Sequence, residues 1–275
     1  MTGTVAVKPP SLSTELLITD DAHRACAVSC ALARPGVYFP VVDGPRMQRI
    51  DRDAEVVRRN NAVARARSET VFLAGLPDAA SSAMIQRLPA AYVRLLADDQ
   101  AIADLLPIDH RKRPPLVWGQ DRIGVGLLLA LRAGTIVVFE DGPSPAIGVP
   151  SRSGHLVICE AGEPLTEVIA ANYAYSLRAG LIVIPSIDDG TANRLMDQLY
   201  RLFDQNISPT TVAEDTAREF RALCGGIDPP PGGSLTVFTR KLPLGLCFPE
   251  VPSTHLFTYP DAGLAVVNGF AAASP

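Results

Sequence analysis

Short apolar runs alternate with amphipathic stretches along most of this chain. Brief apolar runs that are rich in β-branched side chains indicate buried strands. By this criterion we predict strands at residues 15–19, 36–42, 70–74, 91–96, 116–118, 135–139, 156–159 and 181–185. Longer stretches predict helices at residues 22–33, 51–67, 79–88, 126–132, 167–177 and 191–204. Pro40 weakens the second predicted strand, because proline has no N–H to donate to a sheet.

This alternation predicts a three-layer α/β/α fold with a mostly parallel sheet, in a caspase-like or a Rossmann-like arrangement. We divide the chain into an N-terminal α/β half, residues 1–110, and a second α/β half, residues 111–222. Residues 223–275 begin with a loop rich in Gly and Pro and continue as a Pro-rich, β-like tail. This tail is either an added hairpin or part of a larger unit.

Composition narrows the class of partner. The 275 residues are 47% hydrophobic and 20% charged, as in ordinary globular proteins, and the net charge of −4 argues against nucleic acid as the main ligand. Basic residues gather at positions 46–67 and 111–113, where acids or prolines interrupt them, so we interpret them as solvated surface. No leader pattern and no run long enough to span a membrane is present, which predicts a cytoplasmic protein without membrane contact. High Ala, Arg and Pro usage suggests a bacterial source.

Neither a disulfide framework nor a metal site is expected. None of the five cysteines belongs to a C-x-x-C pair, and the four histidines lack the spacing of metal ligands. Cys26 and Cys30 lie four residues apart on a predicted helix, where thiols usually pack as small hydrophobic groups. We therefore predict no metal and no cofactor.

Cys159 is the candidate for thiol chemistry. It ends a predicted apolar strand, and Gly162 and a predicted helix follow it. A helix N-terminus lowers the pKa of a nearby thiol and so favours the nucleophilic thiolate. We expect the strand to present this sulfur at an accessible rim of the sheet. The alternative is a buried thiol that only packs.

Two stretches resemble a known family. The run ICEAG at residues 158–162 is similar to the S-A-C-E-T-G signature of CHAT domains, which are relatives of caspases and separases. Ala179, Gly180 and the run IDDGTANRLMDQLYRLF at residues 187–203 are similar to the A-G-x-S-V-V and V-D-D-x-A-T-A-x-L-M-x-x-F-Y-x-x-L stretches of that family. The resemblance covers about residues 135–205. It implies a caspase-like fold with a Cys–His dyad, as in bacterial proteases that a partner activates, and it places Cys159 at the position of the nucleophile.

The histidine of that dyad has no matching position. The family carries it in an H-G pair at the end of the preceding strand, where this chain has Glu140, Asp141 and Gly142. Such carboxylates would raise the pKa of the thiol. His155 lies on the same predicted strand as Cys159, about 13 Å away at roughly 3.3 Å per residue, which is beyond hydrogen-bond reach. The other candidates for the base are His23, His110 and His255.

A second pattern predicts a nucleotide site. Residues 115–141 have the outline of a Rossmann βαβ unit, in which a glycine turn binds pyrophosphate and an acid after the second strand binds ribose. The residues for these roles are Gly119, Gly124, Gly126 and Glu140. Asp121 stands at the central glycine of G-x-G-x-x-G, where its charge would repel phosphate. Alternatively, the glycines only allow a tight turn and close helix packing.

Pairs of aspartates follow three predicted strands, at residues 20–21, 98–99 and 188–189. If these strand ends gather at one edge of a sheet, the carboxylates could bind magnesium or substrate. Aspartate is also a preferred N-cap of helices, and we favour this second interpretation.

Together these patterns predict a CHAT- or caspase-like module of a bacterial multi-protein assembly. It is either a regulated cysteine peptidase that uses Cys159 or a catalytically degenerate scaffold, and we favour the degenerate form. The alternatives are a Rossmann-like nucleotide-binding protein and a purely structural subunit. Protein partners are expected, with residues 226–275 as a candidate contact, because a histidine and aromatic residues lie between prolines at positions 252–261.

Overall fold

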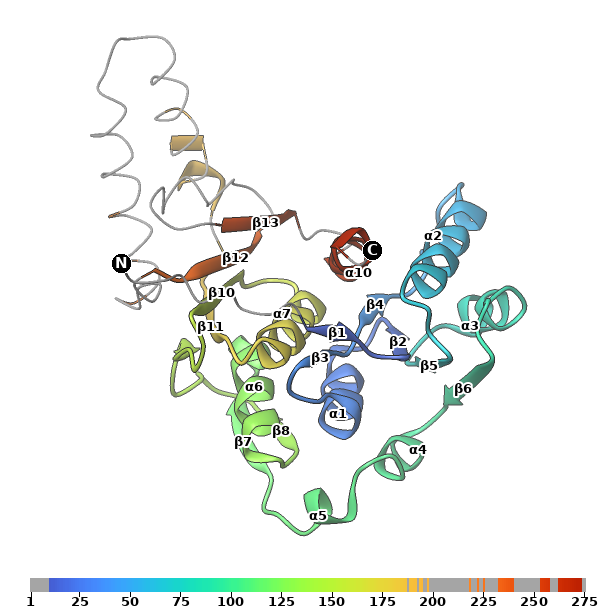
Figure 1. Cartoon of the computed structure of the whole chain (residues 1–275), viewed down its shortest axis with the longest axis horizontal. Helices are drawn as coiled ribbons and strands as arrows, with labels where there is room; N and C mark the ends of the chain where they lie inside the picture. Colours follow the sequence, from blue (N-terminus) through green and yellow to red (C-terminus); the bar gives the residue numbers. More distant parts are fainter. Residues whose placement is uncertain are drawn as a thin grey trace.

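The structure is a computed structural model, in which helices lie between two mostly parallel sheets (Figure 1). It describes residues 10–186, 188–191, 193–194, 197, 218, 222, 225, 232–239, 253–257 and 262–273, with the backbone alone at 253–257 and 271–273. The helices between the sheets are α1 (Ala22–Leu32), α6 (Ile123–Ala133) and α7 (Pro164–Ser176).

The first sheet is parallel and has the order β4-β2-β5-β6. Its strands are β2 (Glu15–Thr19), β4 (Val41–Asp43), β5 (Thr70–Ala74) and β6 (Tyr92–Leu96). Successive residues of β2 belong to different hydrophobic clusters. Leu17 packs with α1, whereas Leu16 and Ile18 pack with α2 (Arg52–Arg65) and α3 (Asp78–Ile85). Because helices cover both faces, the interior of the strand is apolar at every position.

The second sheet has the order β13-β12-β10-β11-β9, in which β9 alone is antiparallel to its neighbour. Its strands are β9 (Gly148–Val149), β10 (His155–Glu160), β11 (Gly180–Ile184), β12 (Ser234–Thr239) and β13 (Ser253–Phe257). All residues of β10, which lies at the centre, are buried. Two smaller parallel sheets pair β1 (Ser11–Leu12) with β3 (Val37–Tyr38), and β7 (Leu116–Gly119) with β8 (Val137–Glu140).

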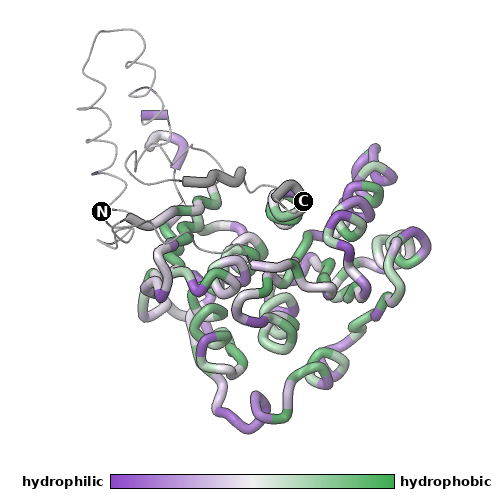
Figure 2. The backbone as a smooth tube through the Cα atoms, viewed as in Figure 1, coloured by the Kyte–Doolittle hydropathy of each residue, from purple (hydrophilic) through white to green (hydrophobic). Residues whose placement is uncertain are grey.

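One hydrophobic cluster joins the two larger sheets. It contains Phe72 of β5, Cys26 of α1, Val168 of α7 and Phe238 of β12. Hydrophobic segments accordingly lie toward the middle of the molecule, and the outer helix α2 is largely hydrophilic (Figure 2). The C-terminal helix α10 (Ala262–Ala273) contacts β4, α2, α7 and β13. Gly263 approaches the carbonyl oxygen of Val41 so closely that no Cβ would fit, so this helix can lie directly on the strand.

The mixed α/β class with mostly parallel strands is confirmed, and the described strands are divided over two larger and two 2-stranded sheets. Residues 36–42 were predicted as one strand that Pro40 weakens, whereas the structure has two strands there, β3 and β4, in different sheets. The tail differs from the prediction: β12 and β13 are parallel and so are not the arms of a hairpin, and its last element is the helix α10. The short helices α4 (Asp99–Ala103), α5 (Ile108–Arg111) and η1 (Gln120–Arg122) were not predicted either. Most of the helix predicted at 191–204, and the positions of Cys224 and Cys247, lie outside the described residues.

The division of the chain near residue 110 remains a prediction. Helix α5 ends and β7 begins around this boundary, although the core cluster contains residues from both sides of it. Within the described ranges, no helix has both the length and the apolar character needed to cross a membrane.

Candidate functional site

Cys159 lies inside the second sheet and not at an accessible rim. Its strand pairs with β11 at Val183 and with β12 at Phe238, and its side chain is 0% exposed. Its Sγ lies 3.6 Å from the carbonyl oxygen of Glu160, to which the thiol donates. Burial raises the pKa of this thiol well above its usual range, and the charges of Glu167 and Glu160 raise it further. The expectation of an exposed sulfur is therefore wrong, because β10 lies between two paired strands and the Cys159 side chain belongs to the hydrophobic cluster that includes residues of α1, α6 and α7.

The described imidazoles all have contacts other than this thiol. His155, on the same strand as expected, lies 2.5 Å from the Ser234 hydroxyl and 2.9 Å from the Thr236 hydroxyl, and burial lowers its pKa to about 4. The ring of His23 stacks on Phe139 at 5.3 Å. His110 contacts the backbone carbonyl oxygen of Cys30 in α1. The side chain of His255 lies outside the described part of the structure. Whether any of them serves as a base stays untested.

Glu140 ends β8, which belongs to a different sheet from β10. Within the described strands, β10 is paired with β11 and β12, both of which follow it in the chain. The strand that would carry the histidine of a CHAT-like dyad is therefore not a neighbour of the Cys159 strand in these pairings.

The βαβ outline of the proposed nucleotide site is present, since β7 and β8 pair in parallel on either side of α6. The glycines, however, are positions of close packing. A Cβ on Gly119 would lie 2.5 Å from the carbonyl oxygen of Gly142, and one on Gly124 would lie 2.7 Å from the carbonyl oxygen of Glu167. A Cβ on Gly126 would lie 2.7 Å from the Trp118 ring. These contacts agree with the alternative interpretation, in which the glycines allow a tight turn and close packing of the helix.

The N-terminus of α6 already has an anion of the protein itself. Glu167, 3% exposed, accepts a hydrogen bond from the backbone N–H of Gly124 at 3.1 Å. Burial raises the pKa of this carboxyl to about 7, against the lowering effects of the Gly124 N–H and the Arg122 charge. Asp121 in turn accepts from the Ser144 N–H at 2.7 Å. These two carboxylates stand where phosphate would approach the helix.

The aspartate pairs act as helix caps. Asp21 accepts from the backbone N–H groups of His23 and Arg24 at the start of α1, at 2.9 and 3.0 Å. Asp98 accepts from the N–H of Ala101 at 2.8 Å, and Asp188 from the N–H of Thr191 at 2.9 Å. The capping interpretation is thus confirmed for one member of each pair. Among the described residues, no group of three or more His, Cys, Asp and Glu side chains is placed to hold a metal ion.

A buried arginine on α2 forms hydrogen bonds and ion pairs with the end of β4. Arg59 is 0% exposed, and its guanidinium donates to the carbonyl oxygen of Asp43 at 3.0 Å, to Oδ2 of Asp43 at 2.5 Å and to Oε2 of Glu55 at 2.7 Å. The side chain of Glu55, one helical turn earlier, is 1% exposed. Residues four apart meet on one face of a helix, so the sequence spacing brings this pair together. The interpretation of residues 46–67 as solvated surface is wrong for Arg59.

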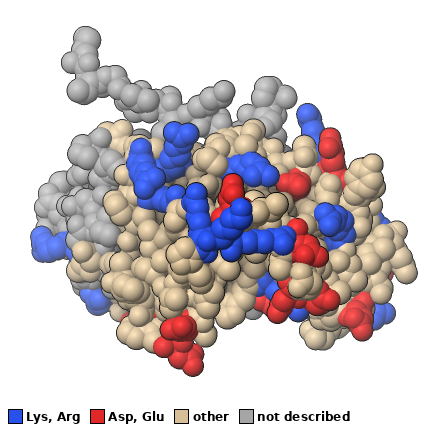
Figure 3. Space-filling model, turned by 90° about the horizontal axis from the view of Figure 1, so that it is seen from below, with Lys and Arg blue, Asp and Glu red and all other residues tan. Residues whose placement is uncertain are grey.

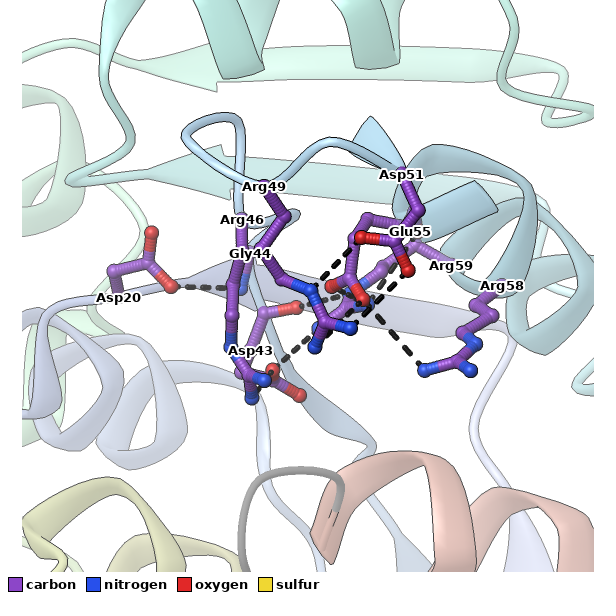
Figure 4. Close-up of polar contacts among 9 residues, drawn as sticks. All are labelled: Asp20, Asp43, Gly44, Arg46, Arg49, Asp51, Glu55, Arg58 and Arg59. Carbon is purple, nitrogen blue, oxygen red and sulfur yellow. Dashed lines mark hydrogen bonds and ion pairs between the residues drawn. The ribbon is translucent and has the colours of Figure 1, made fainter. Parts of the chain in front are cut away.

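Three further arginines surround this pair (Figure 4). Nη1 of Arg58 lies 3.6 Å and Nη1 of Arg49 lies 3.8 Å from Oε1 of Glu55, and Nη2 of Arg46 lies 3.7 Å from Oδ2 of Asp43. The carboxylates lie underneath, whereas the side chains of Arg46, Arg49 and Arg58 keep 30%, 48% and 52% of their surface exposed. An approaching molecule therefore meets guanidinium groups before it meets either acid.

Two exposed aspartates border the network. Asp51 is held by two hydrogen bonds from Arg49, at 2.8 and 3.2 Å, and this contact lowers its pKa. Asp20, at the end of β2, accepts from the N–H of Gly44 at 2.8 Å. Partial removal of water raises the pKa of Asp20, although Gly44, Arg59 and Arg46 oppose the shift. Arg49 thus already binds a carboxylate in the two-point geometry that suits an anionic ligand.

Arg58 also lines a cavity of about 400 Å³ between α2 and α10. The polar lining residues besides Arg58 are Asn61, Arg65 and Asn268, and the others are Ala62, Leu264 and Ala265. None of the described residues that line it is acidic. Arg65 donates through Nη1 to Oδ1 of Asn268, and this hydrogen bond joins the two helices across the cavity.

The sequence held part of the signal for this site. The basic run was visible, and so was the spacing of Glu55 and Arg59. The partner helix α10 was not predicted, because its residues read as tail. A cavity between two helices that are almost two hundred positions apart cannot be recognised from either one alone.

In comparisons with known proteins, no family model, no curated protein and no solved structure matches this chain. The resemblance to CHAT domains therefore stays a prediction.

Proposed function

We propose that this chain is a binding module for a small anionic molecule, which binds in the cavity between α2 and α10. The observation that carries this proposal is the set of described residues that line the cavity, which has two guanidinium groups, two carboxamides and no carboxylate. Its volume of about 400 Å³ lies within the range of small-molecule sites in proteins. A phosphate or carboxylate group is the ligand that such arginines recognise best.

The ion-pair network supports the site by holding Arg58 in place. Oε1 of Glu55 lies 3.6 Å from Nη1 of Arg58, while Oε2 of Glu55 is bound to the buried Arg59. The carboxylate of Glu55 therefore positions the exposed guanidinium of Arg58. The positive charge of Arg59 offsets the repulsion between this carboxylate and an anionic ligand. Asn61 and Asn268 supply donors and acceptors for a polar body.

Calorimetric titration with inorganic pyrophosphate, AMP and adenosine tests this proposal. We expect saturable binding of an anion and much weaker binding of adenosine, which has no phosphate. Arg58→Ala and Arg65→Ala should each weaken binding about ten-fold or more, because each removes a charge-assisted hydrogen bond. Arg87→Ala is the matched control, because this exposed arginine contacts Asp53 outside the cavity.

The proposal is contradicted if neither anion binds with a Kd below about 1 mM, or if Arg87→Ala weakens binding as much as the two cavity variants. Equal affinity for AMP and adenosine would place the binding energy elsewhere than on the arginines.

In this proposal Cys159 has a packing role, which corresponds to the degenerate scaffold rather than to the peptidase. A thiol in the middle of a buried strand reacts with an alkylating reagent only when the protein opens. At neutral pH we expect iodoacetamide to modify Cys159 about 100-fold more slowly in the folded protein than in urea. Cys26 and Cys30, also buried, are matched controls within the same chain.

Peptide mass spectrometry follows the three thiols separately. If Cys159 instead reacts faster than Cys26 and Cys30, and one His→Ala substitution abolishes the difference, the cysteine is activated and the peptidase is the better interpretation.

A further inference from the structure

A second cavity, of about 220 Å³, lies at the C-terminal ends of α1 and α6. Ala31, Pro107 and Leu131 contribute to an apolar wall, and the polar lining groups are Arg34, His110 and Tyr175. Within the described part of the chain, none of the lining residues is acidic, and none of them also lines the site between α2 and α10.

The imidazole of His110 is oriented by the end of α1. Its Nδ1 lies 3.1 Å from the carbonyl oxygen of Cys30, which can only accept, so Nδ1 carries the hydrogen. This leaves Nε2 for another partner. A Cβ built on Gly134, which lines the same cavity, would lie 3.6 Å from Nε2. The second ring nitrogen is therefore directed at the cavity wall that α6 forms.

Positive charge surrounds this cavity. Arg34 is exposed, and its charge acts on the Tyr175 phenol, whose pKa burial raises and Arg34 lowers. Arg113 donates to the carbonyl oxygen of Ala133 at the end of α6, beside Gly134. Basic side chains gather in the middle of the face seen from below, on which α5 lies (Figure 3). Basic side chains near helix C-termini are favourable even without a ligand, because the C-terminal end of a helix carries partial negative charge. This effect does not explain why a cavity lies among them.

We propose that this cavity binds a small organic acid, with its apolar body against the wall and its carboxylate on Arg34 and on the imidazolium form of His110, in which Nε2 also carries a hydrogen and donates. The volume equals that of about seven water molecules, which suits an acid the size of benzoate and excludes a nucleotide. Apolar lining with a few convergent polar groups is typical of small-molecule sites. The preference for an anion comes from Arg34 and His110, together with the lack of acids among the described lining residues.

Titration of the protein with benzoate, followed by NMR of the histidine ring protons, tests this proposal. We expect a saturable shift of the His110 signal, assigned with His110→Gln, and about ten-fold weaker binding of benzyl alcohol, which has the same shape without the charge. Arg34→Ala should weaken benzoate binding by a similar factor, and Ala33→Leu should abolish it by filling the cavity. Lys112→Ala is the control, because this exposed residue on the same face does not line the cavity.

The proposal is overturned if the wild-type protein binds benzoate and benzyl alcohol equally, or does not shift the His110 signal. It also fails if Lys112→Ala and Arg34→Ala reduce affinity alike, since the general field of the face would then explain binding. Arg58→Ala should leave benzoate binding unchanged, so failure here and failure at the α2/α10 site are separate results.

Discussion

Replacing Arg59 by methionine is expected to lower the free energy of unfolding by about 3–5 kcal/mol. Methionine fills much of the same space, so the loss comes from charge rather than from a cavity. Without the guanidinium, the carboxylate of Glu55 stays buried without its strongest partner, and the end of β4 loses its bonds to α2. Urea unfolding at neutral pH measures the change.

Arg58→Met is the matched control on the same helix. Its side chain is half exposed and lies 3.6 Å from the same carboxylate, so we expect a change of about 0.5 kcal/mol or less. Arg59→Met combined with Glu55→Leu should regain a large part of the stability, because it removes the stranded charge. A loss below about 1 kcal/mol for Arg59→Met alone would show that the buried pair does not stabilise this part of the fold.

Glu167→Gln is expected to stabilise the protein by about 3 kcal/mol at pH 8 and by only about 1 kcal/mol or less at pH 5. Burial raises the pKa of Glu167 from its ordinary value of 4.5 to about 7, so the folded protein holds this proton more tightly than the unfolded chain does. The resulting stability is complete below pH 4.5 and is lost as the pH rises through 7. Glutamine cannot ionise, and its carbonyl oxygen can still accept from Gly124.

Chemical unfolding of both proteins at the two pH values gives this difference directly. The pKa of His155 falls from 6.5 to about 4 on folding, which also makes stability depend on pH, but this effect is the same in the wild type and the variant. Glu140→Gln, at an exposed carboxylate, serves as the control and should change neither value. If Glu167→Gln instead destabilises the protein more at pH 8 than at pH 5, the carboxylate is needed in its charged form as the cap of α6.

The local sequence pattern predicted helices and strands well where one local property of the residues determines them. The strands at 15–19 and 70–74 follow from brief apolar runs that both faces of a sheet bury. Pro40 interrupts its strand because proline has no N–H to donate to a sheet. Asp21 caps its helix because its carboxylate accepts from a free N–H group of the first turn. Helix α10 was missed because its many small residues gave no clear amphipathic period among the flanking prolines.

The candidate sites were predicted far less well. The basic run on α2 was seen, but the cavity beside it exists only because α10 lies opposite. His110 was considered as a partner for Cys159, and the structure instead directs it to the carbonyl oxygen of Cys30. In each case the residue type was informative, and its neighbour came from a distant part of the chain.

The sequence by itself determined the α/β class, most strand and helix positions and the helix caps, since these depend on residues within a few positions of one another. Only the tertiary structure decided that Cys159 is buried in the hydrophobic cluster, that Glu167 accepts a hydrogen bond at the start of α6, and that Arg59 is buried. Burial depends on which element packs over a residue, and it sets both the pKa of an ionisable group and its access to a ligand.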